Sequence, residues 1–129
     1  MTNVITFHHA AIATQDIECS VAFYRNVVGL EAGHTPDAPN PLQWMYAGDT
    51  PVIHIFQPKV EREEVDGTIY GVAHLALHID DFEAAKARLD DQGIEYSANI
   101  FESRNSRQLF FDGPDGERIE LIEFGYFDY

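Results

Sequence analysis

The chain has 129 residues, of which 45% are hydrophobic and 12% aromatic, enough for the core of one ordinary domain. Its formal net charge of −14 disfavours nucleic acids and anionic membranes as partners, because phosphates require a basic face. The single cysteine, Cys19, allows no internal disulfide, no apolar run approaches the roughly 20 residues of a membrane span, and the N-terminus lacks signal-peptide features. We therefore expect a cytoplasmic protein.

The first half of the chain predicts a strand, a helix and further strands. Residues 4–14 form the first strand, and Asp16 is a good N-cap for the helix that follows. That helix carries its apolar residues on one face and ends at Gly29, which accepts the left-handed conformation. After a proline-rich loop, "LQWMYAG" and "TPVIHIFQP" predict two strands with a turn at Gly48.

The second half of the chain repeats this order. "GVAHLALHI" predicts a strand, Asp80 or Asp81 caps the next helix, and Gly93 ends it. "EYSANIFES", "RQLFFDG" and "ERIELIEF" are candidate strands, and "GPDG" between the last two is a turn. The second half marks three strands after its helix and the first half marks two of them, and we predict the order β-α-β-β-β for both halves. Matching features recur at nearly the same interval in the two halves, which indicates an internal duplication.

The predicted organisation is one α+β domain over residues 1–129 with two modules. Module one spans about residues 4–58, and module two spans about residues 69–125. A charged segment that is poor in large apolar residues, at about 59–68, is the expected linker.

Strand alternation places four potential metal ligands on one face of the predicted sheets. Apart from His8, the residues on either side of each ligand are apolar and can cover the helices, which leaves the ligand face free. The four are His9, His54, His74 and Glu120. Burying such groups without a partner is costly, and neutral imidazoles with a carboxylate are usual ligands of divalent transition metals.

The segments "HHAAIATQDIECSVAFYRNVVGLE", "VIHIFQP", "AHLALHIDDFEAAKARLDDQGI" and "FFDGPDGERIELIEF" resemble the vicinal oxygen chelate (VOC) superfamily, and they cover nearly the whole chain. That superfamily includes glyoxalase I, fosfomycin-resistance transferases, methylmalonyl-CoA epimerase, extradiol dioxygenases and bleomycin-resistance proteins. The resemblance implies two tandem βαβββ modules that form an open, cup-like β-sheet barrel with the helices outside.

The same resemblance implies one divalent metal per chain, which would be Zn, Ni, Fe, Co or Mn. By position its ligands fall on His9, His54, His74 and Glu120, in agreement with the face argument. Relatives of this kind act on small molecules and usually pair as homodimers, and in some of them each metal takes ligands from both chains. Neither nucleic acid nor membrane is an expected partner.

His54 departs from glyoxalase I, which usually has a carboxylate there and moves a proton with two such groups. Fosfomycin transferases and extradiol dioxygenases use a His-His-Glu set, which His9, His74 and Glu120 would supply. Bleomycin-resistance proteins lack the metal set. The resemblance thus leaves three functions open: a lyase or isomerase in which Glu120 is the catalytic group, an Fe(II) extradiol-type dioxygenase, or a non-catalytic small-molecule binding protein of the resistance type.

A further set of side chains are candidates for the substrate pocket, on weaker grounds. They are His78, Trp44, Tyr46, Phe56 and Arg107. His78 shares the predicted face of His74, and an arginine can hold a substrate carboxylate or phosphate. Each has an ordinary structural alternative, namely a core aromatic residue or a surface ion pair. The sequence selects neither the substrate nor the use of glutathione.

Overall fold

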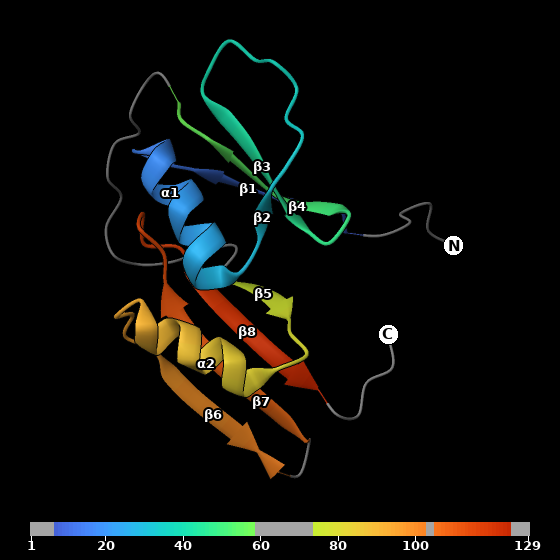
Figure 1. The fold of residues 1–129 in the computed structure, drawn as a ribbon, viewed down its shortest axis with the longest axis vertical. Coiled ribbons are helices and arrows are strands. Elements are labelled where there is room, and N and C mark those ends of the chain that lie inside the picture. Colours follow the sequence, from blue (N-terminus) through green and yellow to red (C-terminus); the bar gives the residue numbers. More distant parts are fainter. Residues whose placement is uncertain (1–6, 59–73, 103–104, 125–129) are drawn as a thin grey trace.

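The computed structural model (Figure 1) describes residues 7–58, 74–102 and 105–124. Within them the chain forms two modules, each a four-stranded sheet with a helix, in the order strand, helix, three strands. This confirms the predicted α+β class and the tandem βαβββ modules. The linker expected at 59–68 lies outside the described residues. No helix in the described ranges is long and apolar enough to cross a membrane.

Module one begins with a short strand and a capped helix. Its elements are β1 (Ala10–Ala13), α1 (Ile17–Phe23), the π-helical turn η1 (Tyr24–Val28), β2 (Glu31–Ala32), β3 (Leu42–Ala47) and β4 (Thr50–Phe56). Asp16 is the N-cap, and its carboxylate accepts a hydrogen bond from the Cys19 N–H at 3.2 Å. The helix ends at Gly29, whose φ of 95° is left-handed, as predicted. The strand order is β1-β4-β3-β2, with β1 parallel to β4.

Module two repeats the same plan. Its elements are β5 (Leu75–His78), α2 (Phe82–Asp91), β6 (Ser97–Phe101), β7 (Ser106–Asp112) and β8 (Arg118–Phe124). Of the two aspartates expected at the helix start, Asp81 is the N-cap and accepts from the Ala84 N–H at 3.0 Å. The strand order is β5-β8-β7-β6, with β5 parallel to β8. The predicted "GPDG" turn joins β7 to β8, and the Gly116 N–H donates to the Gly113 carbonyl at 3.0 Å.

One hydrophobic core lies between the sheets and the helices. Alternate residues of the central strands β4 and β8 enter it, and none of them is more than 1% exposed: Ile53, Ile55, Ile119 and Leu121. The alternating positions between them, His54 and Glu120, therefore face the other side of their sheets. The apolar residues of β4 and β8 thus cover the helices, as the sequence pattern predicts.

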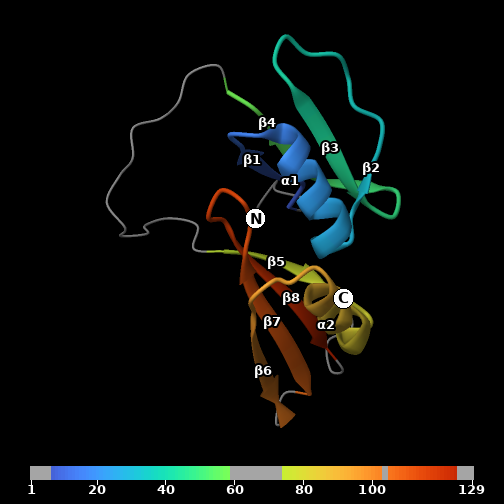
Figure 2. The same cartoon turned by 60° about the vertical axis from the view of Figure 1, so that its left-hand side comes forward.

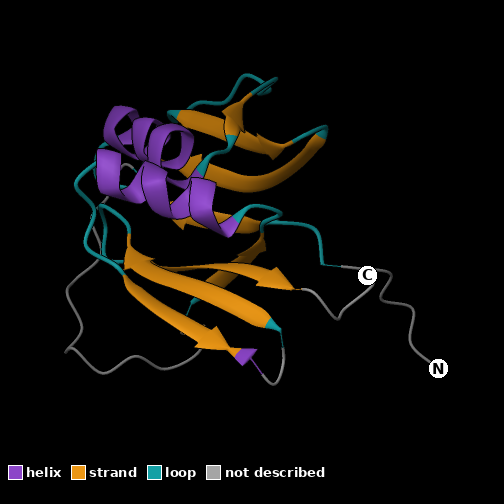
Figure 3. Ribbon diagram, turned by 60° about the horizontal axis from the view of Figure 1, so that its bottom comes forward, coloured by secondary structure: helices purple, strands orange, loops and turns teal. Residues whose placement is uncertain are grey.

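The two modules meet at their helical elements, with α1 next to α2 (Figures 2 and 3). The Arg88 guanidinium of α2 caps the end of η1, donating to the carbonyls of Val27 at 3.0 Å and Val28 at 3.2 Å. Phe23 of α1 also meets Phe111 of β7, with ring centroids 6.2 Å apart. The described part of the chain thus carries two separate four-stranded sheets joined on their helix-covered sides.

A second connection between the modules comes from the turn before β8. The Asp115 carboxylate accepts hydrogen bonds from the Thr14 hydroxyl at 2.7 Å, the Gln15 N–H at 3.1 Å and the Ser20 hydroxyl at 3.3 Å. Thr14 and Ser20 are buried, at 4% and 0% exposure. Hydrogen bonds to a charged acceptor in such a place are among the stronger ones in proteins. The turn of module two therefore anchors the start of α1.

Candidate metal centre

The first pair of candidate ligands lies on the free face of module one. His54 occupies the middle of β4 between two core isoleucines, and Ala11 of β1 lies directly opposite it. His9 precedes β1, two residues before Ala11, and so starts the same face. The ring centroids of His9 and His54 are 6.0 Å apart. The small side chain of Ala11 leaves room between the strands for the two imidazoles to approach each other.

Aromatic contacts hold these imidazoles in place. Trp44 of β3 stacks on His54, with ring centroids 4.8 Å apart and planes 11° from parallel. The His9 ring meets Trp44 edge-on at 4.7 Å, and Phe56 lies 5.6 Å from His54. Stacking and edge contacts of this kind restrict ring rotation, which favours a defined position for the ring nitrogens. Trp44 and Phe56, both predicted as pocket residues, therefore border His54.

The electrostatics of this pair suit metal binding. Burial, and then the nearby His9, lower the pKa of His54 below its usual value near 6.5. Its imidazole is therefore neutral at pH 7, with a lone pair available to a cation. The Nδ1 atoms of His8 and His9 lie 2.7 Å apart, so one ring donates a hydrogen bond to the other. The Nε2 atom of His9 takes no part in this hydrogen bond.

The second pair of candidate ligands lies on the free face of module two. His74 Nε2 is 3.5 Å from Glu120 Oε1, and the side chains are 43% and 9% exposed. Ala76 of β5 pairs with Glu120, which leaves space beside the carboxylate. Phe110 of β7 pairs with Glu120 on its other side and meets His74 edge-on at 5.9 Å. A nearby cation would stabilise a nearly buried carboxylate that has only one imidazole beside it.

The structure brings the four predicted ligands together as two pairs. Among the described residues, no group of three or more His, Cys, Asp or Glu side chains is placed to hold a metal ion. The modules are joined on their helix sides, and each pair lies on the sheet face away from its helix. One chain in this arrangement therefore presents two half-sites, one with two imidazoles and one with an imidazole and a carboxylate.

Two of the predicted pocket residues lie apart from these pairs. The Tyr46 hydroxyl donates to the His34 carbonyl at 2.7 Å, and the β3–β4 register shifts between Met45 and Tyr46. His78 is at the end of β5, with its ring 5.5 Å from Phe124. It lines a pocket of about 440 Å³ whose lining includes neither His74 nor Glu120. Their roles toward a substrate stay predictions.

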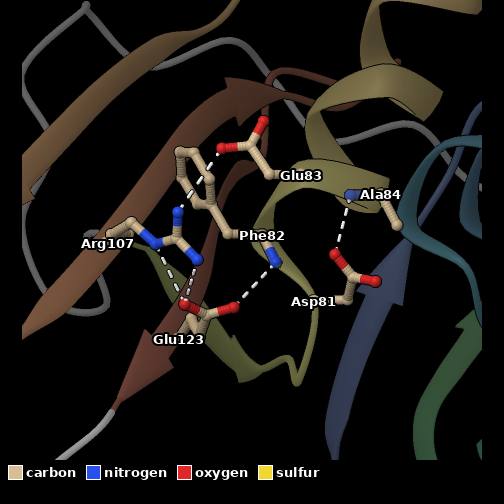
Figure 4. Close-up of polar contacts among 6 residues, drawn as sticks. All are labelled: Asp81, Phe82, Glu83, Ala84, Arg107 and Glu123. Carbon is tan, nitrogen blue, oxygen red and sulfur yellow. Dashed lines mark hydrogen bonds and ion pairs between the residues drawn. The ribbon is translucent and has the colours of Figure 1, made fainter.

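Arg107 lies on the helix side of the second sheet (Figure 4). Its guanidinium donates to Glu123 Oε1 at 2.6 and 2.9 Å and to Glu83 at 3.4 Å, and it lies over the Phe82 ring at 4.7 Å. The other Glu123 oxygen accepts from the Phe82 N–H at 2.8 Å. Arg107 lines the same pocket as His78, but its charge is already engaged by two carboxylates.

Two residues that share the face of Glu120 are absent from the predicted site. Phe110 packs on His74, and Arg118 lies two positions before Glu120 on β8. The signal for Arg118 was present, because strand alternation assigns positions 118 and 120 to the same face. Phe110 requires the β7–β8 register, which the length of the "GPDG" turn sets.

Comparison with known proteins identifies the family of the chain. The profile of the Glyoxalase/Bleomycin resistance protein/Dioxygenase superfamily matches residues 6–121. A lactoylglutathione lyase of Salmonella typhimurium is 30% identical over 124 residues, covering 89% of this chain and 90% of that protein. An ethylmalonyl-CoA/methylmalonyl-CoA epimerase of Cereibacter sphaeroides is 30% identical over 93 residues, covering 67% of this chain and 69% of that protein.

A solved structure extends the comparison to the fold. A glyoxalase/dioxygenase from Nostoc punctiforme superposes with a TM-score of 0.78 at 24% identity, covering 95% of this chain and 92% of that one. The paired βαβββ modules and this superposition define a glyoxalase/dioxygenase-type fold. The chain belongs to the Glyoxalase/Bleomycin resistance protein/Dioxygenase superfamily.

Proposed function

We propose that the protein is a metal-dependent lyase or isomerase that binds a small substrate through two adjacent oxygens and moves a proton beside a carbonyl. The observation that carries the proposal is the presence of two donor pairs, His9 with His54 and His74 with Glu120, on the free faces of duplicated modules. The relatives support the same reaction class, because one is named a lyase and another an epimerase.

The complete site is proposed to form between two chains of a homodimer. The helix-side packing of the modules supports this arrangement, since it leaves the two donor pairs apart in one chain. A second copy would bring its His74 and Glu120 to the His9 and His54 of the first, giving two equal sites per dimer. Pairing would also cover open sheet edges, which are otherwise prone to unwanted association.

The donor set fits a divalent transition metal such as Zn, Ni, Fe, Co or Mn. His54 is kept neutral at pH 7 by its lowered pKa, and Glu120 is a nearly buried carboxylate. When bound, the metal supplies Lewis acidity to the substrate oxygens. His9, His54 and His74 then serve as ligands only, because an imidazole whose lone pair is engaged cannot also accept a proton.

Glu120 is the proposed proton-transfer group. Its carboxylate has a second oxygen besides Oε1, the atom near His74, and it sits in a nearly water-free position between β5 and β7. From there it can take a proton from the carbon beside the substrate carbonyl and return it at a neighbouring atom. His54 occupies the position at which glyoxalase I usually has its second carboxylate. Efficient turnover of the methylglyoxal–glutathione hemithioacetal is therefore not expected.

Metal analysis and a substrate panel test the proposal. Purified protein is expected to hold about one divalent metal per chain, and His9→Ala and His74→Ala are each expected to lose it. The panel comprises the hemithioacetal, 2-oxo acids, acyl thioesters and catechols, assayed with each metal. Full metal occupancy in both alanine variants would refute the ligand assignment. Oxygen consumption with catechols and iron would favour a dioxygenase instead.

A further inference from the structure

Arg118 lies near the His74–Glu120 pair, and the Phe110 ring contacts both Arg118 and His74. It is two residues before Glu120 on β8, so the two side chains share the free face of the sheet. Its guanidinium carbon is 5.4 Å from the centroid of the Phe110 ring. The same ring meets His74 edge-on at 5.9 Å. Residue 110 is also the partner of Glu120 in the β7–β8 register. Phe110 therefore contacts both the Arg118 cation and a candidate metal ligand.

The Arg118 guanidinium is open to a new partner. Its Nη1 is 3.2 Å from Asp112 Oδ1, but the two side chains are 44% and 61% exposed. An exposed pair of this kind contributes little stability and exchanges readily for another anion. The planar guanidinium can form two parallel hydrogen bonds with a carboxylate, which gives recognition by shape as well as by charge.

The other basic side chains in the described residues lie elsewhere. They are Arg25 and Lys86, on the helical elements, Arg88, bound to the end of η1, and Arg107, on the helix side of the second sheet. The chain as a whole carries a net charge of −14, which repels an anionic substrate. A cation beside Glu120 would offset that repulsion at the place where the substrate binds. A neutral substrate would gain nothing from it.

We propose that Arg118 selects substrates that carry a carboxylate in addition to the two oxygens that approach the metal. This inference rests on the proposed function, and it narrows the substrate class to small organic acids. The carboxylate would lie over the edge of Phe110, with the chelating oxygens toward His74 and Glu120. Arg118 is a specificity-determining residue in this scheme and takes no part in proton transfer.

Two ligands with the same chelating group test the inference on the metal-loaded protein. Acetohydroxamate offers two adjacent oxygens, and succinate monohydroxamate offers the same pair with an added carboxylate. Calorimetry on wild type is expected to show about tenfold tighter binding of the succinate compound, the usual effect of a charge-assisted hydrogen bond. Arg118→Gln is expected to abolish that preference while leaving acetohydroxamate affinity and metal content unchanged.

Two further variants separate recognition from structure and from overall charge. Asp112→Asn removes the exposed pair but keeps the guanidinium, so the preference is expected to persist or to grow. Lys86→Gln removes one positive charge from α2 and is expected to leave the preference intact. Equal affinities in wild type, an undiminished preference in Arg118→Gln, or its loss in Asp112→Asn would overturn the inference. Failure of wild type to bind metal or acetohydroxamate would overturn the proposed function itself.

Discussion

The buried hydroxyl of Tyr24 donates a hydrogen bond to the Glu117 carboxylate at 2.9 Å, joining η1 of module one to the turn of module two. Tyr24 is fully buried, and the other Glu117 oxygen accepts from the Asp115 N–H at 2.9 Å. Burial, followed by the nearby Glu117 carboxylate, raises the pKa of Tyr24 far above its usual value near 10. The phenol therefore keeps its proton, and remains a donor, at neutral and moderately alkaline pH.

Replacing Tyr24 by Phe is expected to lower the free energy of unfolding by about 1.5 to 3 kcal/mol, because a partly buried carboxylate loses its donor. Urea denaturation at pH 7 measures the change. Tyr96→Phe is the matched control, since Tyr96 donates to Asp90 at 2.8 Å on the exposed surface and should cost far less. Equal losses of unfolding free energy in the two variants would show that the contact between modules stabilises the protein no more than the exposed one does.

Mixing two inactive variants tests the division of the metal site between chains. His9→Ala and His74→Ala are each expected to disable both sites of their own dimer. If each site takes one half from each chain, a mixed dimer contains one site with both defects and one complete site. Metal content and activity are therefore expected to reappear after the variants are mixed, unfolded and refolded together. The double variant His9→Ala/His74→Ala mixed with either single variant should recover nothing.

Glu120→Gln separates metal binding from proton transfer. The amide keeps one oxygen that can face a cation but cannot accept a proton, so activity is expected to fall at least about a hundredfold. Residual metal should exceed that of Glu120→Ala, which has no donor at all. Elemental analysis and turnover of whichever substrate the panel identifies provide the measurements. Activity that survives in Glu120→Gln would remove this residue from the proton-transfer role.

The Arg107–Glu123 pair predicts how stability changes with pH. Burial acts to raise the pKa of Glu123, but hydrogen bonds from Arg107 and from the Phe82 N–H outweigh it, and the net pKa is lowered. A lowered pKa in the folded state stabilises the protein above the unfolded value, near 4.3, and this contribution is lost as the pH falls through the folded value.

Glu123→Gln is therefore expected to cost about 1 kcal/mol at neutral pH. The difference from wild type should stay constant between about pH 6 and pH 8 and shrink below about pH 4. Urea titrations across this range measure it. Glu83→Gln is the control, because that carboxylate is 71% exposed and 3.4 Å from Arg107. A difference that grows on acidification would contradict the assigned sign.

Local patterns in the sequence predict much of the fold and the sheet faces on which candidate ligands lie. The caps at Asp16 and Asp81 and the left-handed Gly29 and Gly93 follow from chemistry within one turn of the chain. Alternation in β4 and β8 assigns His54 and Glu120 to the faces on which they lie. Each of these features depends on neighbouring residues only, which is why sequence alone suffices.

Other features depend on contacts that no local pattern encodes. The β3–β4 register shifts between Met45 and Tyr46, and the Tyr46 hydroxyl bonds the His34 carbonyl; neither feature has a clear mark in the sequence. The engagement of Arg107 by Glu123 and Glu83 also depends on contacts between separate elements, although its alternation with the buried Leu109 and Phe111 places it on the helix side. The separation of the donor pairs follows from packing between modules, through contacts such as that of Arg88 with Val27.

The helix-side packing of the modules has a thermodynamic consequence for a site shared between chains. Two donors hold a divalent ion far more weakly than four, so a lone chain would bind metal poorly. Association of chains and loading of metal then strengthen each other by the same factor, as linkage requires. Dilution would release the ion, and abundant ion would draw chains together. The cellular concentration of this protein would thus set the fraction of chains that hold metal in a complete site, in addition to the total number of chains.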